Sequence, residues 1–304
     1  MDVRFGTYNL YKLTIPKAQE ERYRYEQVVR VIRTMGVHVL AVQEIIGAEP
    51  DDGAKVLWQL ADDTGLTCTT APDPTTGAPA GPALASSQHH FHTGLLWHPD
   101  LTAVPGGWHA YNGSPDFWHS LATLVLDAGG PQVKFASFHA DPFRPDWRYN
   151  EARRVTSAFR AGIPGAVGAD WNAISADRRP DGSLFDDDPY TGQDHVDLEY
   201  QVEWRDDPTA PPKADRRASE VLRRGGLLDT AAALDVPWEP TTGHWADGQG
   251  DPDRWGPRRI DTIRITEHLT PALRAHRTVR TPDTLAASDH LPVVVDLALA
   301  QVTG

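Results

Sequence analysis

Several side chains that could do chemistry follow apolar stretches of the sequence, where strands are expected to end. They are Asn9, Glu44, His139, Asp170 with Asn172, Asp261, and Asp289 with His290. Such a set could hold a cation, activate water, stabilise anionic oxygens and donate a proton. Hydrolysis of a phosphate ester needs these four functions. Any one of these residues taken alone is as well explained by a turn or a strand end.

Three of the residues are candidate metal ligands. Glu44 offers a hard oxygen ligand suited to Mg²⁺ or Mn²⁺, and Asn9 could help to hold that ion without adding charge. Asp289 could complete the coordination of one ion or bind a second ion. The alternative for Glu44 is a strand-end carboxylate on the surface.

The remaining residues are candidates for the catalytic step. Asp170 could orient or deprotonate a water molecule, while Asn172 could donate a hydrogen bond to a phosphate oxygen. His290 could contact the phosphate, with Asp261 fixing its tautomer and supporting its positive form. The alternatives are an Asx-turn for the Asp-x-Asn stretch and a buried core histidine for His290.

These residues can meet only if the strands before them end close together. Apolar runs and alternation predict strands at residues 3–10, 37–42, 91–97, 117–126, 133–139, 165–169, 258–266 and 291–299. Helical spacing predicts helices at residues 25–35, 54–64, 151–160 and 215–224. Residues 71–87, 175–212 and 243–257 are expected to be loops. Strands and helices mixed without a linker favour one α/β domain over residues 1–304, with face-to-face sheets and helices outside.

The order and local sequence of the polar residues carry more information than any one of them. They read Thr7-Tyr8-Asn9, Val42-Gln43-Glu44, Ser137-Phe138-His139, Ala169-Asp170-Trp171-Asn172, Ile260-Asp261-Thr262-Ile263 and Ser288-Asp289-His290-Leu291-Pro292. This ordered set resembles the endonuclease/exonuclease/phosphatase superfamily, which includes deoxyribonuclease I-like nucleases, apurinic endonucleases, neutral sphingomyelinases and inositol polyphosphate phosphatases. The resemblance runs from Asn9 to Pro292, nearly the whole chain.

The resemblance implies a four-layered α/β sandwich, with two central mixed β-sheets packed face to face and helices outside. It also implies a divalent-metal-dependent phosphoric ester hydrolase of the nuclease, phosphodiesterase or phosphatase type, with magnesium or manganese as cofactor. His139 sits where nuclease-like members have a second histidine, which makes it a candidate acid for the leaving oxygen. Thr262 stands where many relatives have an aromatic or basic residue, which argues against a substrate contact from this strand and leaves the pairing of Asp261 with His290 in place.

Composition limits where the protein works. The chain carries a net charge of -13, which opposes nonspecific attraction to a polyanion. Its single cysteine, Cys68, rules out an internal disulfide framework, and no secretory signal opens the sequence, so a cytoplasmic location is expected. No apolar run approaches the roughly 20 residues that would span a bilayer, so no membrane anchoring is expected.

Two substrate classes compete: a nucleic acid, which needs an extended basic groove, and a phosphorylated small molecule, which needs an enclosed pocket. Arginines beside the motifs could form a cationic rim or simply a solvated face: Arg144, Arg148, Arg153, Arg154, Arg178, Arg179, Arg254, Arg258 and Arg259. Tryptophans in the same loops could stack on a base or pack in the core: Trp147, Trp171, Trp245 and Trp255. Acidic residues of one loop could bind an accessory Ca²⁺ or remain solvated: Asp186, Asp187, Asp188, Asp194 and Asp197.

Another class of function also fits the same fold. The chain could be a noncatalytic binding protein, or a fold member recruited to non-phosphate chemistry in specialised metabolism. The intact set of polar residues argues against the first of these and leaves the second open. No protein partner is inferred from the sequence.

Overall fold

Two six-stranded mixed sheets lie at the centre of the computed structural model, which describes residues 2–47, 49–160, 162–192, 200–203, 207, 209–246 and 255–302. The first sheet has the strand order β11-β12-β1-β2-β4-β3 and the second has the order β5-β6-β7-β8-β10-β9. The first comprises β1 (Asp2–Leu13), β2 (Val39–Ile46), β3 (Leu84–Ala85), β4 (Phe91–Trp97), β11 (Leu273–Thr278) and β12 (Val293–Ala298). The second comprises β5 (Thr102–Asn112), β6 (Ser120–Asp127), β7 (Gln132–His139), β8 (Gly165–Asp170), β9 (Leu227–Asp229) and β10 (Asp261–Thr266).

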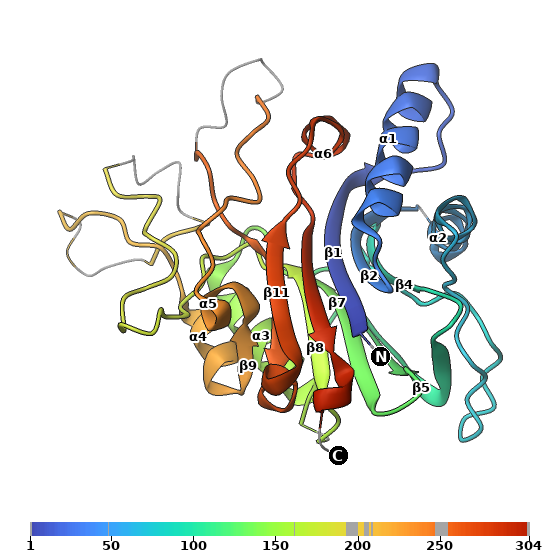
Figure 1. The fold of residues 1–304 in the computed structure, drawn as a ribbon. Helices are drawn as coiled ribbons and strands as arrows, with labels where there is room; N and C mark the ends of the chain where they lie inside the picture. Colours follow the sequence, from blue (N-terminus) through green and yellow to red (C-terminus); the bar gives the residue numbers. More distant parts are fainter. Residues whose placement is uncertain are drawn as a thin grey trace.

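Helices cover the outer face of each sheet. They are α1 (Gln19–Met35), α2 (Pro50–Thr64), α3 (Pro145–Ala158), α4 (Arg217–Arg224), α5 (Thr230–Leu234) and α6 (Pro282–Ala287), with short 3-10 helices at Glu267–Ala272 and Leu299–Gln301. Apolar residues of α1 and α2 pack on the first sheet, and those of α3 and α4 pack on the second. Figure 1 shows these helix pairs on opposite sides of the sheets. The expected four-layered α/β sandwich is confirmed.

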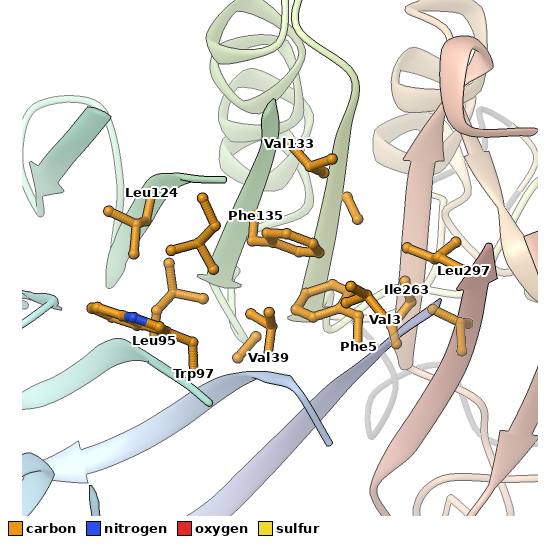
Figure 2. Close-up of a cluster of buried hydrophobic side chains, with 14 of the residues drawn as sticks. Val3, Phe5, Val39, Leu95, Trp97, Leu124, Val133, Phe135, Ile263 and Leu297 are labelled. Atoms are coloured by element: carbon orange, nitrogen blue, oxygen red, sulfur yellow. The ribbon is translucent and has the colours of Figure 1, made fainter. Parts of the chain in front are cut away.

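The inner faces of the two sheets form a continuous apolar core. Phe5 of β1 and Phe135 of β7 meet across it with ring centroids 5.1 Å apart. Figure 2 shows Val3 and Phe5 of the first sheet in the same cluster as Phe135 and Ile263 of the second. Strand alternation explains this, because every second residue of each strand points into the space between the sheets.

Toward one end of the sandwich, the inward-facing positions become polar. Gln43 of β2 donates from Nε2 to Ser137 Oγ of β7 at 3.0 Å, and Ser137 Oγ donates to the Val42 carbonyl at 2.8 Å. The Thr7 Oγ1 hydroxyl of β1 donates to Gln43 Oε1 at 3.3 Å. Buried polar groups must find partners, so this hydrogen-bonded layer fixes how the two sheets sit on each other just below the motif residues.

Each predicted strand and helix has a counterpart in the structure, and the further elements, which were not predicted, lie at sheet edges or are short. Residues 102–112 form β5, which was not predicted because Pro105, Gly106 and Gly107 interrupt its pattern at an irregularity in the pairing with β6. Edge strand β11 was also missed, since charged residues break its apolar alternation. Within the expected loop 71–87, Leu84–Ala85 adds a short edge strand.

Buried ion pairs hold the long segment between β8 and α4, whose described residues form no helix or strand. Arg259 donates to Asp186 Oδ2 at 2.5 Å and to Asp229 Oδ2 at 2.8 Å, and all three side chains are buried. The expectation that Asp186 either binds Ca²⁺ or is solvated is therefore wrong, because Arg259 occupies its carboxylate. Asp194 and Asp197 lie outside the described residues.

No helix in the described part of the chain combines the length and the apolar character that a membrane span requires.

The close approach of the sheets beneath the polar end gives a first prediction. A Cβ at Gly168 of β8 would lie 2.6 Å from Thr7 Cβ and 3.1 Å from Ala41 Cβ of the opposite sheet. Gly168→Ala should therefore lower the free energy of unfolding by about 1–3 kcal/mol through overpacking. Denaturant unfolding would measure this, with Gly81→Ala as the control because a Cβ there meets nothing within 4 Å. Equal stability of both variants would contradict the tight contact.

Candidate active site

Three of the predicted residues lie side by side on neighbouring strands of the second sheet. Asp170 ends β8 and is paired with His139 on parallel β7 and with Asp261 on antiparallel β10. Residues paired across strands point to the same face. That face is the inner one. Phe135, four residues before His139, and Ile263, two residues after Asp261, point to the same face and belong to the core between the sheets.

The first sheet contributes Asn9 and Glu44 at irregularities in the pairing of β1 with β2. Tyr11, Lys12 and Glu44 all have positive φ, at 47°, 52° and 60°. Non-glycine residues rarely adopt this region, and such conformations persist where the surroundings enforce them. Here the bulged backbone turns the Glu44 carboxylate toward Asn9, and the Lys12 backbone N–H donates to Glu44 Oε2 at 2.9 Å.

Asn9 joins the two sheets at the site. Its Nδ2 donates to Asp170 Oδ2 at 3.0 Å and to Glu44 Oε1 at 3.3 Å. Its Oδ1 accepts from the Tyr11 backbone N–H at 3.0 Å, which fixes the orientation of the amide. The three predicted residues Asn9, Glu44 and Asp170 are therefore brought together by direct hydrogen bonds.

His290 is paired with Asp261. His290 Nδ1 lies 2.8 Å from Asp261 Oδ2, and His290 Nε2 lies 3.9 Å from Asp170 Oδ2. Burial alone would lower the pKa of His290, but Asp261, Asp289 and Asp170 raise that pKa well above its usual value. The imidazole is thus held protonated, with Nδ1–H directed at Asp261 and Nε2–H on the side of Asp170.

Carboxylates gather at this end of the sandwich more densely than cationic side chains. Burial, first of all, raises the pKa of Glu44, Asp170 and Asp261, and nearby carboxylates add to the effect. Asp170, Asp261 and His290 each present a ligand atom, and these atoms lie within 4.8 Å of one another, so the group could hold a metal ion. Asp289 is partly exposed, with its Oδ1 4.0 Å from His290 Nε2.

His139 is buried beneath the site. Its Nε2 lies 3.5 Å from Asp170 Oδ2, and its ring stacks on His119 with centroids 4.0 Å apart. Burial, aided by the positive charge of His290, lowers the pKa of His139 to about 3. His139 is therefore a neutral imidazole placed to donate to Asp170.

Asn172 closes the arrangement on the side of a cavity of about 300 Å³. Its φ is 48°, its backbone N–H donates to Asp170 Oδ1 at 3.0 Å, and its Nδ2 donates to the Ala140 carbonyl at 3.1 Å. The Asp-x-Asn stretch is thus an Asx-turn, which brings Asn172 to the edge of the cavity. Asn172, Asp289 and His290 all line that cavity.

The arginines beside the motifs, for which a cationic rim and a solvated face were the alternatives, are mostly occupied by other contacts in the described part of the chain. Arg148 and Arg259 are buried, and both serve to hold the backbone or carboxylates in place. Arg144, Arg154 and Arg179 pair with carboxylates. Of the nine flanking arginines, Arg258 lines the cavity, while Arg254 lies outside the described residues.

Of the four tryptophans, one lies in the core and two line the cavity, whereas the ring of Trp147 on α3 lies under the Arg144 guanidinium, away from the cavity lining. Trp171 is buried against Phe138, and its Nε1 donates to the Thr262 carbonyl at 3.3 Å. Trp245 and Trp255 line the cavity beside His290. Thr262 is itself buried within β10, consistent with the expectation that it makes no substrate contact.

Two residues that support the site escaped prediction as site residues. Ser288 Oγ donates to the Asn9 carbonyl at 2.8 Å and accepts from the His290 backbone N–H at 3.1 Å, so it ties His290 to β1. Thr241 Oγ1 accepts from the Asp261 backbone N–H at 3.1 Å. Ser288 adjoins Asp289 and His290 in the sequence, which was a usable signal, whereas nothing near Thr241 in the sequence marks its role.

Comparison with solved structures places this geometry on a known fold. No protein-family model and no curated protein matches the sequence. An endonuclease/exonuclease/phosphatase from Bacteroides vulgatus is similar with a TM-score of 0.63 and 14% identity, covering 98% of each chain. One from Beutenbergia cavernae has a TM-score of 0.61 and 20% identity, covering 100% of this chain and 72% of that one. The human Nocturnin catalytic domain, solved with a bound sulfate anion, has a TM-score of 0.56 and 16% identity, covering 97% and 93%. The resemblance drawn from the motifs is confirmed at the level of the fold.

The pairing of Asp261 with His290 yields a prediction on protonation. Asp261→Asn keeps the size of the side chain but removes the charge that raises the pKa of His290. The pKa of His290 should fall by at least about 1 pH unit, because a neutral amide cannot stabilise the imidazolium as a carboxylate does. NMR titration of the histidine side chains would measure it, with Asp283→Asn as the control because that carboxylate is exposed and paired with Arg30. An unchanged titration of His290 would contradict the assigned pairing.

Proposed function

We propose that this chain, which has the endonuclease/exonuclease/phosphatase fold, is a divalent-metal-dependent hydrolase of phosphate esters that uses an activated water molecule. The observation that carries the proposal is the closeness of a buried carboxylate to an imidazole that lines the cavity: Asp170 Oδ2 lies 3.9 Å from His290 Nε2. A general base beside a fixed positive charge suits attack of water on an anionic phosphorus centre.

Asp170 is the proposed base. Its Oδ2 accepts hydrogen bonds from Asn9, and its raised pKa, caused first by burial, brings its basicity closer to that of water-activating carboxylates. The water oxygen forms a bond to phosphorus while Asp170 takes its proton. The ester P–O bond breaks, the alcohol oxygen takes a proton from solvent, and Asp170 later returns its own proton to solvent.

His290 and Asn172 are the proposed phosphate-binding groups. The positive imidazole, held by Asp261, would face the phosphoryl oxygens that gain negative charge, and the Asn172 amide would donate to another oxygen. His139 was expected to act as the leaving-group acid. Its buried, neutral ring beside Asp170 supports a different role, in which His139 positions the Asp170 carboxylate.

The donor set fits a hard divalent cation such as Mg²⁺ or Mn²⁺. Both oxygens of Asp261 face His290 Nδ1, and His290 is protonated, so these two are poorly placed to bind a cation. We therefore propose Glu44 as the principal ligand, with Asp289 beside it. Asn9 would join them only by turning its Oδ1 toward the ion, because its Nδ2 now faces Glu44 and its Oδ1 accepts from the Tyr11 N–H. A bound divalent ion would supply positive charge against the phosphate oxygens.

Metal dependence is tested by activity and by binding. The protein should hydrolyse a simple phosphate monoester or diester with added Mg²⁺ or Mn²⁺ and lose that activity with a chelator. Glu44→Gln should weaken Mn²⁺ binding, measured by electron paramagnetic resonance, by about 10-fold or more, because a neutral amide replaces a charged ligand. Asp283→Asn is the matched control, since Asp283 is exposed on α6. Full activity after chelation would overturn the metal assignment.

The role of Asp170 is tested by a conservative change. Asp170→Asn retains the shape of the side chain and removes the base, so kcat should fall by about 10²- to 10⁴-fold. Circular dichroism and unfolding would check that the fold persists. Undiminished kcat in a folded variant would exclude Asp170 as the base. Metal binding at Glu44 without hydrolysis of any phosphate ester would instead favour recruitment to other chemistry or a noncatalytic role.

A further inference from the structure

We propose that the substrate is a small phosphate ester whose alcohol carries a flat ring, bound in the 300 Å³ cavity beside His290. This inference rests on the proposed function and adds the substrate class to it. Residues of the proposed site and aromatic residues both line the cavity. We call the first group, Asn172, Asp289 and His290, the catalytic side, and the second group, Phe143, Tyr200, Trp245 and Trp255, the aromatic side.

Two of the aromatic side chains are exposed although they are large and apolar. Phe143 is 52% exposed and Tyr200 is 38% exposed. They contact each other edge to face, with ring centroids 5.8 Å apart, although they come from different loops. Exposed apolar groups that gather at a cavity mark a place where a ligand excludes water.

Trp245 is held in place and connected to the catalytic residues. Its Nε1 donates to the Leu285 carbonyl at 2.6 Å, and its ring meets Tyr11 edge to face at 5.0 Å. The Tyr11 backbone N–H donates to Asn9 Oδ1, so Trp245 packs on the same bulge that positions Asn9 and Glu44. A ring bound against Trp245 would therefore lie at a fixed position relative to the reacting phosphate.

The size and charge of the cavity oppose a polynucleotide. A volume of about 300 Å³ lies at the lower end of the range for small-ligand sites. Among the described residues that line it, Arg258 is the one arginine or lysine, and Asp289 adds a carboxylate. Binding a polynucleotide depends on neutralising many phosphates. This cavity instead matches a single phosphate with one planar apolar group attached.

The reaction is the hydrolysis proposed above, applied to such an ester. Water forms the new bond to phosphorus, the ester P–O bond breaks, and the products are inorganic phosphate and the ring-bearing alcohol. Stacking on aromatic side chains accepts any flat ring, because each presents a π-face. An aryl group and a nucleobase share this chemistry, and the experiment separates them.

The first test compares esters whose alcohols differ in the ring and little in intrinsic reactivity. With Mg²⁺, 2-phenylethyl phosphate should have a KM at least about 5-fold lower than that of ethyl phosphate, the effect of one stacked ring. A nucleoside 5′-monophosphate forms a third arm, which distinguishes a base from an aryl group. A single-stranded oligonucleotide forms the fourth. Equal KM values with and without the ring, or a preference for the oligonucleotide, would overturn the inference while leaving phosphate-ester hydrolysis intact.

Variants of the exposed aromatics locate the effect. Phe143→Ala and Tyr200→Ala should each raise the KM for 2-phenylethyl phosphate by roughly 5-fold or more, and should raise it by a larger factor than the KM for ethyl phosphate. Trp58→Ala is the matched control, because Trp58 is 43% exposed on α2 and does not line the cavity. Equal KM values for the two variants, the control and the unchanged protein would contradict the assignment of Phe143 and Tyr200 to the substrate-binding aromatic side.

A binding measurement separates failure of this inference from failure of the proposed function. Calorimetric titration with 2-phenylethylphosphonate and ethylphosphonate needs no turnover. If no ester is hydrolysed, the proposed function fails, but tighter binding of the ring-bearing phosphonate that Phe143→Ala abolishes would still support the aromatic site. Equal binding of both phosphonates would overturn it.

Discussion

Charged carboxylates at the end of an apolar sandwich must find partners, and this requirement governs the structure of the site. Asn9 meets it with one amide, whose Nδ2 donates both to Glu44 in its own sheet and to Asp170 in the opposite sheet. Removing hydrogen-bond partners from buried charges is costly, so the contact fixes the relative position of the sheets where the chemistry is proposed. Beneath it, Gln43 and Ser137 repeat the same kind of link with neutral groups.

The electrostatic character of the site follows from this placement. Burial raises the pKa of Glu44 and Asp170, and the carboxylates around His290 keep its imidazole positively charged. The carboxylates of Glu44, Asp170, Asp261 and Asp289 outnumber the cations that the described part of the chain places close to them, which are His290 and the Arg24 guanidinium that interacts with Glu44 and Asp289, so negative charge is in excess. A divalent cation would balance that excess, and together with His290 it would make the site attractive to a phosphate. The proposed metal and the proposed substrate thus both follow from the same distribution of charge at the site.

The strand ends were predictable from the sequence because they depend on local pattern. Apolar alternation followed by a polar residue put His139 and Asp170 at strand ends, where the structure has them, and the pattern also predicted the strands that contain Asn9 and begin at Asp261. The Asp261–His290 pair was also predictable, although the residues lie 29 positions apart, because its chemistry is specific and its motif ordered. Edge strands β5 and β11 were not predictable. Few of their residues are buried, so their sequences need not alternate between apolar and polar residues.

The burial of certain arginines and the make-up of the cavity depend on long-range packing, so the sequence alone did not predict them. Arg148 and Arg259 look like surface cations in the sequence, yet both are buried, because hydrogen-bond partners come from segments far along the chain. The aromatic side of the cavity draws residues from loops that only the fold brings together, such as Phe143 with Tyr200.

Diffraction from crystals soaked in Mn²⁺ and inorganic phosphate would test the central claim most directly. The account predicts an anomalous peak about 2.1–2.2 Å from a Glu44 carboxylate oxygen, a distance typical of small hard divalent cations, with phosphate in contact with His290 and Asn172. A manganese peak remote from Glu44, or phosphate bound away from the cavity that His290 lines, would contradict it.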